Sequence, residues 1–288
     1  MNYDFLGIGD TATDAFIRLE NPSAHIDIDK GVKEICMHFA EKVPYEEVYV
    51  IPAVGNSANA AVAAARLGLK SALVSNLGDD YFGKECLDAL CSEKVSTDYI
   101  TFHKNLKTNY HYVLWYEDDR TILVKHEEYP YQFSDIIGPK WIYLSSLGES
   151  SLLFHAEIEK YLAAHPEVKL AFQPGTFQMK FGKSALAGIY KRSDVFFCNR
   201  EESQRILETD EDDIKKLLKA MAALGPKITV ITDGVNGAYS YDGKKALSMR
   251  LYPDPAPPLE RTGAGDAFSS TFTVALALGK SVREAMMW

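Results

Sequence analysis

Short apolar segments alternate with helical patterns through the second half of this 288-residue chain, and this alternation constrains the fold more than any other feature. A strand, a helix and a second strand form the unit of a parallel sheet, because parallel neighbours need a long crossover connection. The sequence therefore predicts an α/β fold with a doubly wound, mostly parallel sheet flanked by helices. The expected strands are 141–146, 168–172, 195–198 and 228–232, with one helix at 152–164 and another ending near 224.

The first expected strand, at 3–9, is apolar, ends in glycine and is followed by Asp10 and Asp14. In open α/β sheets, ligands gather beyond the carboxyl ends of the strands, so both acids are candidates for a binding site. Asp10 by itself fits a solvated turn equally well.

The composition is that of an ordinary globular protein, with 47% hydrophobic and 25% charged residues. A chain of this length can bury one large core, so we expect a single domain over 1–288. The net charge of −9 argues against nucleic-acid binding. Four cysteines without a C-x-x-C pair indicate reduced thiols, and the N-terminus has the pattern of neither a signal nor a membrane span. We expect a cytoplasmic protein without membrane association.

Residues 101–127 are dense in aromatic and β-branched side chains and predict a hairpin. Its strands would be 110–116 and 121–126, joined by a turn at 118–119. Its position between α/β units indicates a sheet appended to the main one, although an ordinary core hairpin is an alternative. Nearer the N-terminus we expect strands at 15–19 and 49–51 and a short helix at 31–40.

The segment 259–266 reads Leu-Glu-Arg-Thr-Gly-Ala-Gly-Asp and follows four prolines that exclude a helix before it. An apolar pattern of helical spacing comes next, so a helix should begin near Gly263. Unpaired amides at a helix start form an anion site, and glycines at 263 and 265 let a bulky anion approach the backbone. Asp266 would lie beside that anion. It fits a general base for a hydroxyl group that attacks phosphorus, or simply an acid favoured by the helix dipole.

Another polar cluster stands at the start of a helix of small residues at 58–65. Asn56, Ser57 and Asn59 crowd the beginning of this helix, and Gly68 should end it. We expect one of the three polar side chains to cap the helix. Since a cap needs only one of them, the others are candidates for ligand binding.

Asn199 and Glu202 begin a further helix directly after a strand. Their spacing of three places both side chains on one helical face. The pair fits a capping box, with Asn199 as N-cap and Glu202 three residues later. It also fits a binding site, and the two interpretations are compatible.

These segments resemble the signatures of the ribokinase-like (PfkB-type) carbohydrate kinases. The family motif D-T-x-G-A-G-D ends in Gly263, Ala264, Gly265 and Asp266, while Glu260 and Arg261 replace its usual Asp and Thr. The first signature, G-G-x-x-x-N-x-A-x-x-x-x-x-L-G, is matched except for its first glycine, where Val54 stands. Its matching residues are Gly55, Asn59, Ala61, Leu67 and Gly68.

Three shorter motifs follow the same resemblance. Asn199 and Glu202 match N-x-x-E. The motif T-x-G-x-x-G is matched by Thr232, Gly234 and Gly237, and the motif G-x-D-x-x-G, which we interpret as structural, by Gly78, Asp80 and Gly83.

The resemblance implies a ribokinase-like fold with a small β-sheet lid, built from roughly 11–52 and 101–127. It implies an ATP-dependent kinase that phosphorylates a hydroxyl group of a sugar or sugar-like substrate. Its cofactors would be ATP and Mg²⁺, with a monovalent cation as a further option, and the lid would join two copies into a homodimer. Asp266 would be the base beside the backbone of Gly263, Ala264 and Gly265, and Glu202 would hold Mg²⁺ through water. The substrate would contact Asp14, Gly55, Asn56 and Asn59, and the nucleotide would contact Asn199, Thr232, Gly234 and Gly237.

Two other functions stay open. A nucleoside kinase of the same fold is suggested by aromatic residues that could stack on a base, namely Phe16, Phe102, Tyr110, Tyr112 and Trp115. A non-catalytic sugar-binding or regulatory module is the other, because family members generally continue beyond the helix expected after Ser281. A dinucleotide-dependent oxidoreductase is disfavoured, since no G-x-G-x-x-G follows the first strand.

Overall fold

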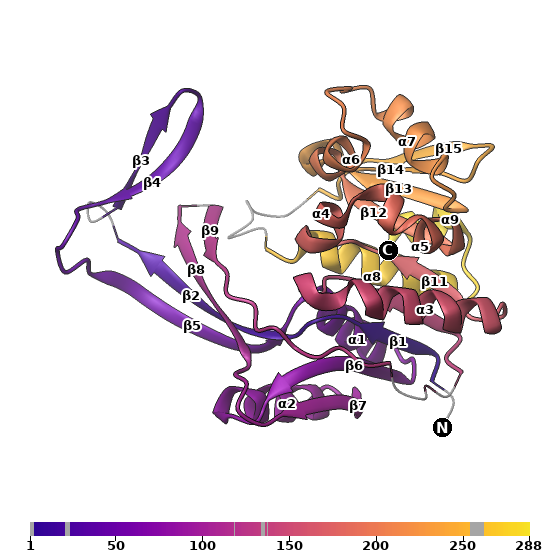
Figure 1. The fold of residues 1–288 in the computed structure, drawn as a ribbon. Coiled ribbons are helices and arrows are strands. Elements are labelled where there is room, and N and C mark those ends of the chain that lie inside the picture. Colours follow the sequence, from indigo (N-terminus) through magenta and orange to yellow (C-terminus); the bar gives the residue numbers. More distant parts are fainter. Residues whose placement is uncertain (1–2, 21–23, 118, 134–135, 137, 254–261) are drawn as a thin grey trace.

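The computed structural model describes residues 3–20, 24–117, 119–133, 136, 138–253 and 262–288. Figure 1 shows a layered body of sheet and helices with a second sheet standing to one side. The body sheet has nine strands in the order β15-β14-β13-β12-β11-β10-β1-β6-β7. These strands are β1 (Phe5–Ile8), β6 (Ser71–Gly78), β7 (Ser96–His103), β10 (Trp141–Leu144), β11 (Lys169–Phe172), β12 (Val195–Asn199), β13 (Ile228–Thr232), β14 (Ala238–Tyr241) and β15 (Ala246–Met249).

The body sheet is mostly parallel. All neighbours from β7 to β13 run parallel, and only the pairs that involve β14 are antiparallel. The alternation of strands and helices in the sequence predicted this arrangement, and the expected strands and the helix at 152–164 are present with small shifts at their ends.

Helices cover both faces of this sheet, and each central strand supplies apolar side chains to both. In β1, Leu6 and Ile8 join the cluster under α3, α5, α6 and α7, while Phe5 joins the cluster under α1, α8 and α9. Strands that are buried on both faces are typical of parallel sheets. The helices are α1 (Asn56–Arg66), α2 (Tyr81–Ser92), α3 (Leu152–Ala164), α4 (Thr176–Ala185), α5 (Ala187–Arg192), α6 (Arg200–Leu207), α7 (Ile214–Ala222), α8 (Ala264–Ala277) and α9 (Val282–Met287), with 3₁₀ turns η1 (Glu149–Ser151) and η2 (Gly234–Asn236).

The second sheet, here called the lid, has the strand order β5-β2-β8-β9. Its strands are β2 (Ala12–Leu19), β5 (Tyr45–Val54), β8 (Asn109–Tyr116) and β9 (Asp119–Leu123). Strand β2 is antiparallel to β5 and parallel to β8, and β8 is antiparallel to β9. The expected hairpin is therefore present in a separate sheet rather than in the core. Its second strand begins at Asp119, which was expected in the turn, and ends at Leu123 instead of residue 126.

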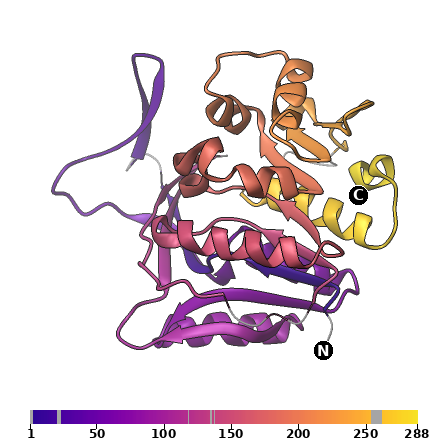
Figure 2. The ribbon, with the colours of Figure 1, turned by 45° about the vertical axis from the view of Figure 1, so that its right-hand side comes forward.

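The prediction of a short helix at 31–40 is wrong. Residues in this range belong to a hairpin of β3 (Ala24–Asp29) and β4 (Val32–Met37), which Figure 1 and Figure 2 both show extending away from the body. Lys30 and Gly31 form its two-residue turn with φ of 50° and 84°. Two consecutive positive φ values are the requirement of the hairpin turn that fits the twist of paired strands. Local turn geometry thus decided the structure of this segment.

Within the described ranges, no helix combines the length and the apolar character needed to cross a bilayer.

Candidate active site

The carboxyl ends of the parallel strands meet the starts of α1 and α8 at one edge of the body sheet. A pocket of about 300 Å³ lies there. Gln173 follows β11, Asn199 ends β12 and Thr232 ends β13, and all three line this pocket. Because a parallel sheet brings its carboxyl ends to one edge, residues from distant parts of the chain share one site. Its lining also includes Asn56, Glu202, Gly263, Gly265 and Asp266.

Gly263 caps the N-terminus of α8 in the left-handed conformation, with φ 80° and ψ −3°. The glycine provides this conformation without the strain that a side chain would add. The helix then begins at Ala264, as the sequence predicted. The preceding segment, which includes Glu260 and Arg261, lies outside the described residues.

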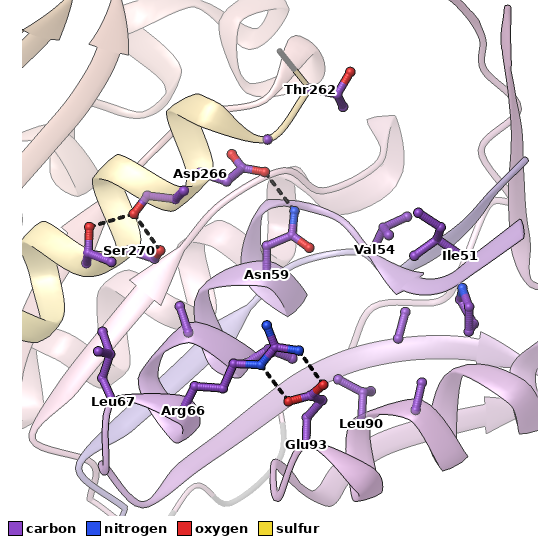
Figure 3. Close-up of a pocket in the computed structure, with 18 of the residues that line it drawn as sticks. Ile51, Val54, Asn59, Arg66, Leu67, Leu90, Glu93, Thr262, Asp266 and Ser270 are labelled. Carbon is purple, nitrogen blue, oxygen red and sulfur yellow. Dashed lines mark hydrogen bonds and ion pairs between the residues drawn. The ribbon is translucent and has the colours of Figure 1, made fainter. Parts of the chain in front are cut away.

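Three side-chain amides hold the carboxylate of Asp266. Asn56 Nδ2 donates to Oδ1 over 2.8 Å and Asn59 Nδ2 donates to Oδ2 over 2.9 Å, both from the first turn of α1. Gln173 Nε2 donates to Oδ1 over 3.2 Å. Figure 3 shows Asn59 and Asp266 pointing toward one another from α1 and α8. The carboxylate is thus fixed at the pocket by hydrogen bonds from two separate segments.

The expectation that a polar side chain caps α1 is wrong. Gly55 is the N-cap, and no side chain caps the helix. Asn56 and Asn59 instead bond Asp266, while Ser57 Oγ donates to the carbonyl oxygen of Ile8 over 2.7 Å. Tertiary partners compete successfully with the helix end for these side chains.

Burial raises the pKa of Asp266 above its usual value, and the amide donors from Asn59, Gln173 and Asn56 partly offset that rise. Burial disfavours the charged form, whereas hydrogen bonds to the carboxylate favour it. The result is a shielded, oriented carboxylate whose bonded partners are neutral amides, a suitable acceptor for a proton.

Gln173 was not singled out from the sequence, although it lies directly beyond a strand at the edge where ligands bind. Its Oε1 accepts hydrogen bonds from the hydroxyl groups of Tyr143 and Ser269, the latter over 3.0 Å. These two donors orient the amide so that Nε2 faces Asp266. The sequence feature that could have identified Gln173 as a site residue is its position as a polar residue directly after the buried 168–172 segment.

Asn199 and Glu202 form the capping box that their spacing predicted. The Asn199 side chain accepts from the backbone of Glu202 over 2.7 Å, and Glu202 Oε2 accepts from the backbone of Asn199 over 2.9 Å. Both residues also line the pocket with Asp266. Burial raises the pKa of the Glu202 carboxyl group, and the charge of Asp266 adds to that rise. The capping role and a place in the site therefore coexist.

Of the three T-x-G-x-x-G residues, only Thr232 is among the described residues that line this pocket. Thr232 lines it, whereas Gly234 begins the 3₁₀ turn η2. Gly237 has φ 92°, and a Cβ there would collide with the carbonyl oxygen of Met249. Close packing against β15 therefore explains the glycine at 237.

Asp14 lies on the lid, apart from the residues around Asp266. Its Oδ1 is 3.1 Å from His111 Nδ1 on the neighbouring strand β8. Gly55 lies between lid and body with φ 124°, and a Cβ there would be 2.6 Å from the carbonyl oxygen of Asp10. A side chain at 55 would therefore disturb the junction between β1 and α1.

Asp10 is buried rather than a solvated turn residue. Its Oδ2 accepts from the hydroxyl group of Tyr131 over 2.6 Å, and Oδ1 has no hydrogen-bond partner among the described residues. Burial raises the pKa of Asp10 to about 7.

The structural interpretation of Gly78, Asp80 and Gly83 is confirmed. The Asp80 side chain caps α2 by accepting from the backbone of Gly83 over 2.8 Å, and it also accepts from the backbone of Thr108 over 3.0 Å. A Cβ at Gly83 would collide with the carbonyl oxygen of Gly78.

Comparison with known proteins identifies the family. The model of the pfkB family of carbohydrate kinases matches residues 23–287. The chain belongs to the pfkB family of carbohydrate kinases. It is similar to a ribokinase of Bacillus subtilis, with 28% identity over 81% of this chain and 76% of that protein. It is also similar to a cytidine kinase of Thermococcus kodakarensis, with 28% identity over 81% of this chain and 83% of that protein.

Solved structures show the same fold. The structure of an Arabidopsis thaliana ribokinase complexed with ribose and ATP superimposes with a TM-score of 0.80 at 21% identity, covering 99% of this chain and 89% of that one. The ribokinase-like fold with its small lid sheet, expected from the motifs, is confirmed.

In this pfkB-family protein, Val54 replaces the first glycine of the first signature, and it lies beside the site. Val54 ends β5 and lines a larger cleft of about 920 Å³ together with Ile51, Asn59 and Asp266. Figure 3 shows Val54 and Ile51 on one side of this cleft and Asp266 on the other. An isopropyl group therefore stands where family members usually have no side chain.

The residues present fit a weakly ligated Mg²⁺ rather than a protein cage. Among the described residues, no group of three or more His, Cys, Asp or Glu side chains could hold a metal ion. Two partly buried carboxylates with raised pKa values, Glu202 and Asp266, line one pocket. Mg²⁺ commonly keeps several waters and uses one or two carboxylates plus substrate phosphates, which agrees with this set.

Proposed function

We propose that this chain transfers the γ-phosphoryl group of ATP to a hydroxyl group of a sugar or sugar-like acceptor. The observation that carries the proposal is the carboxylate of Asp266, held by three amides in the pocket where α8 begins. An oriented, partly buried acid beside the free amides of a helix start suits the removal of a proton from a hydroxyl group that attacks phosphorus. The family membership supports the same reaction.

In the proposed reaction, Asp266 accepts the proton of the acceptor hydroxyl group as its oxygen bonds to the γ-phosphorus. The bond between that phosphorus and the bridging oxygen of ADP breaks, and ADP leaves with the electron pair. The backbone amides of Gly263, Ala264 and Gly265 stabilise charge on the transferring group, since α8 leaves its first amides unpaired. Phosphoryl transfer depends mainly on such positioning and charge stabilisation.

The nucleotide is proposed to lie along Asn199, Thr232, Gly234 and Gly237, at the ends of β12 and β13. Glu202 holds Mg²⁺ through water in this proposal. When bound, Mg²⁺ would neutralise phosphate charge. A monovalent cation is a further candidate. The capping box fixes Glu202 at the pocket independently of any ligand.

The acceptor is proposed to lie between lid and body, against Asp14, Gly55, Asn56 and Asn59. Asn56 and Asn59 already use one amide hydrogen each on Asp266, and each amide retains a carbonyl oxygen and a second hydrogen for a sugar hydroxyl group. The lid would exclude water, so that ATP is not hydrolysed without an acceptor.

A panel of sugars, sugar phosphates and nucleosides, assayed for ADP formation with ATP and Mg²⁺, tests the proposal. At least one acceptor should turn over, and Asp266→Asn should retain nucleotide binding while turnover falls by on the order of a thousandfold. Near-normal turnover in Asp266→Asn would remove the base from the mechanism. Calorimetry that detects sugar binding without ATP binding would favour the non-catalytic module instead.

A nucleoside kinase is the second candidate, because the similar proteins include the Thermococcus cytidine kinase. The aromatic residues support it less than the sequence suggested. Tyr110 and Tyr112 line a different pocket, with Phe82 and Lys125, and Trp115 is buried beside Tyr49 and Arg18. The nucleosides of the panel separate this candidate from the first.

We also propose that the chain forms one domain over 1–288 and a homodimer through the lid. Strand β5 is an edge strand of the lid, and Tyr45, Val48 and Val50 on it are exposed. A long apolar edge strand is prone to pair with another chain. Sedimentation of the chain, compared with Val50→Lys, measures the oligomeric state and tests the interface.

A further inference from the structure

The tip of the lid brings a positive charge to the catalytic pocket. Arg120, on β9, lines the pocket together with Asp266 and Glu202. Among the described residues that line this pocket, Arg120 is the one with a positively charged side chain. Asp266 and Glu202 belong to the body, so the positive charge comes from a separate element, the lid.

The register of the lid explains why Arg120 faces the pocket. Side chains two residues apart in a strand share a face. His111, Val113 and Trp115 therefore lie on one face of β8; Asp14 is paired with His111, and Arg120 with Trp115. The face that carries the proposed acceptor-binding Asp14 near the body thus carries Arg120 at its far end.

Contacts within the chain hold the tip of the lid, near Trp115 and Glu117, in place without a ligand. Trp115 is 6% exposed, lies beneath the guanidinium of Arg18 at 5.0 Å, and donates from Nε1 to the carbonyl oxygen of Glu117 over 2.9 Å. Glu117 begins the turn between β8 and β9 with φ 54°. These contacts hold the end of β8, with which Arg120 pairs through Trp115.

The guanidinium of Arg120 is available to an anion. Its Nη1 is 3.1 Å from Asp119 Oδ1, but the Asp119 side chain is 80% exposed. Ion pairs with exposed partners contribute little, so a phosphate group could replace this one at small cost. Arginine binds phosphate oxygens through two parallel N–H donors.

We propose that Arg120 contacts the phosphoryl group while it moves from ATP to the acceptor. This inference rests on the proposed kinase function and adds a catalytic residue that the sequence motifs do not contain. As the bond to ADP breaks and the bond to the acceptor oxygen forms, charge accumulates on the transferring oxygens, and Arg120 stabilises it from the lid side opposite the amides of α8. Full turnover then requires the lid tip to be in place.

Steady-state kinetics of Arg120→Gln and Arg120→Lys test this role, with Lys125→Gln as the matched control. Lys125 lies on the same chain segment but lines the other pocket, with Tyr110 and Tyr112. Arg120→Gln should lower kcat by on the order of a hundredfold or more, with KM for the acceptor changed by only a few-fold. Arg120→Lys should recover part of the loss, and Lys125→Gln should be near wild type.

A kcat of Arg120→Gln within threefold of wild type would overturn the inference. An increase in acceptor KM at unchanged kcat would also overturn it, because Arg120 would then bind the acceptor itself. Calorimetry with ADP, Mg²⁺ and tetrafluoroaluminate, a mimic of the transferring group, gives a readout that needs no identified acceptor. Tetrafluoroaluminate should tighten ADP binding to the wild type at least tenfold more than to Arg120→Gln, and equal tightening would contradict the role.

The two proposals fail differently. If the wild type turns over no acceptor but the Arg120→Gln variant loses the tightening, the acceptor panel is at fault and Arg120 keeps its role. If the wild type binds no nucleotide, the proposed kinase function fails and this inference fails with it.

Discussion

Asn59 and Asp266 are separated by 207 residues in sequence, yet Asn59 Nδ2 donates to Asp266 Oδ2 over 2.9 Å. The bond joins the first turn of α1 to the first turn of α8, the two helices that carry the principal family signatures. A residue expected to contact the substrate is therefore also a support for the proposed base. The same holds for Asn56, which bonds the other carboxylate oxygen.

Asn59→Asp should lower turnover more than Asn59→Ala does. Alanine removes one donor from a largely buried carboxylate, and we expect turnover to fall on the order of tenfold, since a hydrogen bond to a charged group contributes about 1.5–3 kcal/mol. Aspartate places a second carboxyl group beside the first, so the two share a proton and the base is lost. Equal kcat values for the two variants would contradict the proposed role of Asn59 as a support for Asp266.

Gln173→Ala should shift the pH dependence of catalysis. Amide donors lower the pKa of Asp266 and burial raises it, so removal of the Gln173 donor should raise that pKa. The base must be deprotonated, and the acid limb of kcat/KM against pH should therefore move to higher pH. Ser269→Ala removes a hydroxyl group that bonds Gln173, the carbonyl oxygen of Gly265 and the hydroxyl group of Tyr143 but does not bond the Asp266 carboxylate, so it should cause a smaller shift in the same direction. An unchanged limb in Gln173→Ala would separate Gln173 from the base.

Glu202→Gln separates helix capping from the proposed metal role. Glutamine can maintain the capping box with Asn199, so the free energy of unfolding should stay within about 0.5 kcal/mol of the wild type. Turnover should fall and require more Mg²⁺, because the amide lacks the charge that attracts the cation. Glu202→Ala loses both the capping box and the negative charge, and its free energy of unfolding should also fall by about 1 kcal/mol. Wild-type Mg²⁺ dependence in Glu202→Gln would leave only the capping role.

Gly55→Ala should destabilise the protein more than Gly68→Ala. Both glycines have positive φ, 124° and 93°, but a Cβ at 55 would be 2.6 Å from the Asp10 carbonyl oxygen, and a Cβ at 68 would meet nothing within 4 Å. Gly68→Ala measures the backbone strain alone, about 1–2 kcal/mol. Gly55→Ala adds a steric clash, and we expect a total loss above about 3 kcal/mol. Urea denaturation of both variants gives the comparison, and equal losses would show that the junction relaxes.

Asp10 should make the protein less stable as pH rises. Its folded pKa of about 7 lies above its ordinary value of 3.8, so between these values the folded state binds a proton that the unfolded state has lost. The contribution of Asp10 to the free energy of unfolding is fully present below about pH 4. It declines as the pH rises toward 7, by on the order of 4 kcal/mol at most. Asp10→Asn should flatten that decline, whereas Asp79→Asn, at an exposed acid, should not. Parallel stability curves for Asp10→Asn and the wild type between pH 4 and 8 would refute the assignment.

The sequence by itself determined the α/β architecture, the start of a helix near Gly263, the capping box of Asn199 and Glu202, and the family. These features depend on neighbours in sequence: apolar periodicity, glycine at a left-handed position and side chains three residues apart. The hairpin at 24–37 also has a local cause in Lys30 and Gly31, but a two-residue turn is a weak signal in a polar segment, and a helix was expected there.

Only the tertiary structure decided which atoms surround the proposed base and what each polar residue contacts. Asn56 and Asn59 bond Asp266 instead of capping their helix, Gln173 is oriented by Tyr143 and Ser269, and Arg120 reaches the pocket from a different sheet. The physical reason is that a parallel sheet gathers the ends of distant strands at one edge. Hydrogen bonds formed there depend on distances in space, which local periodicity does not encode.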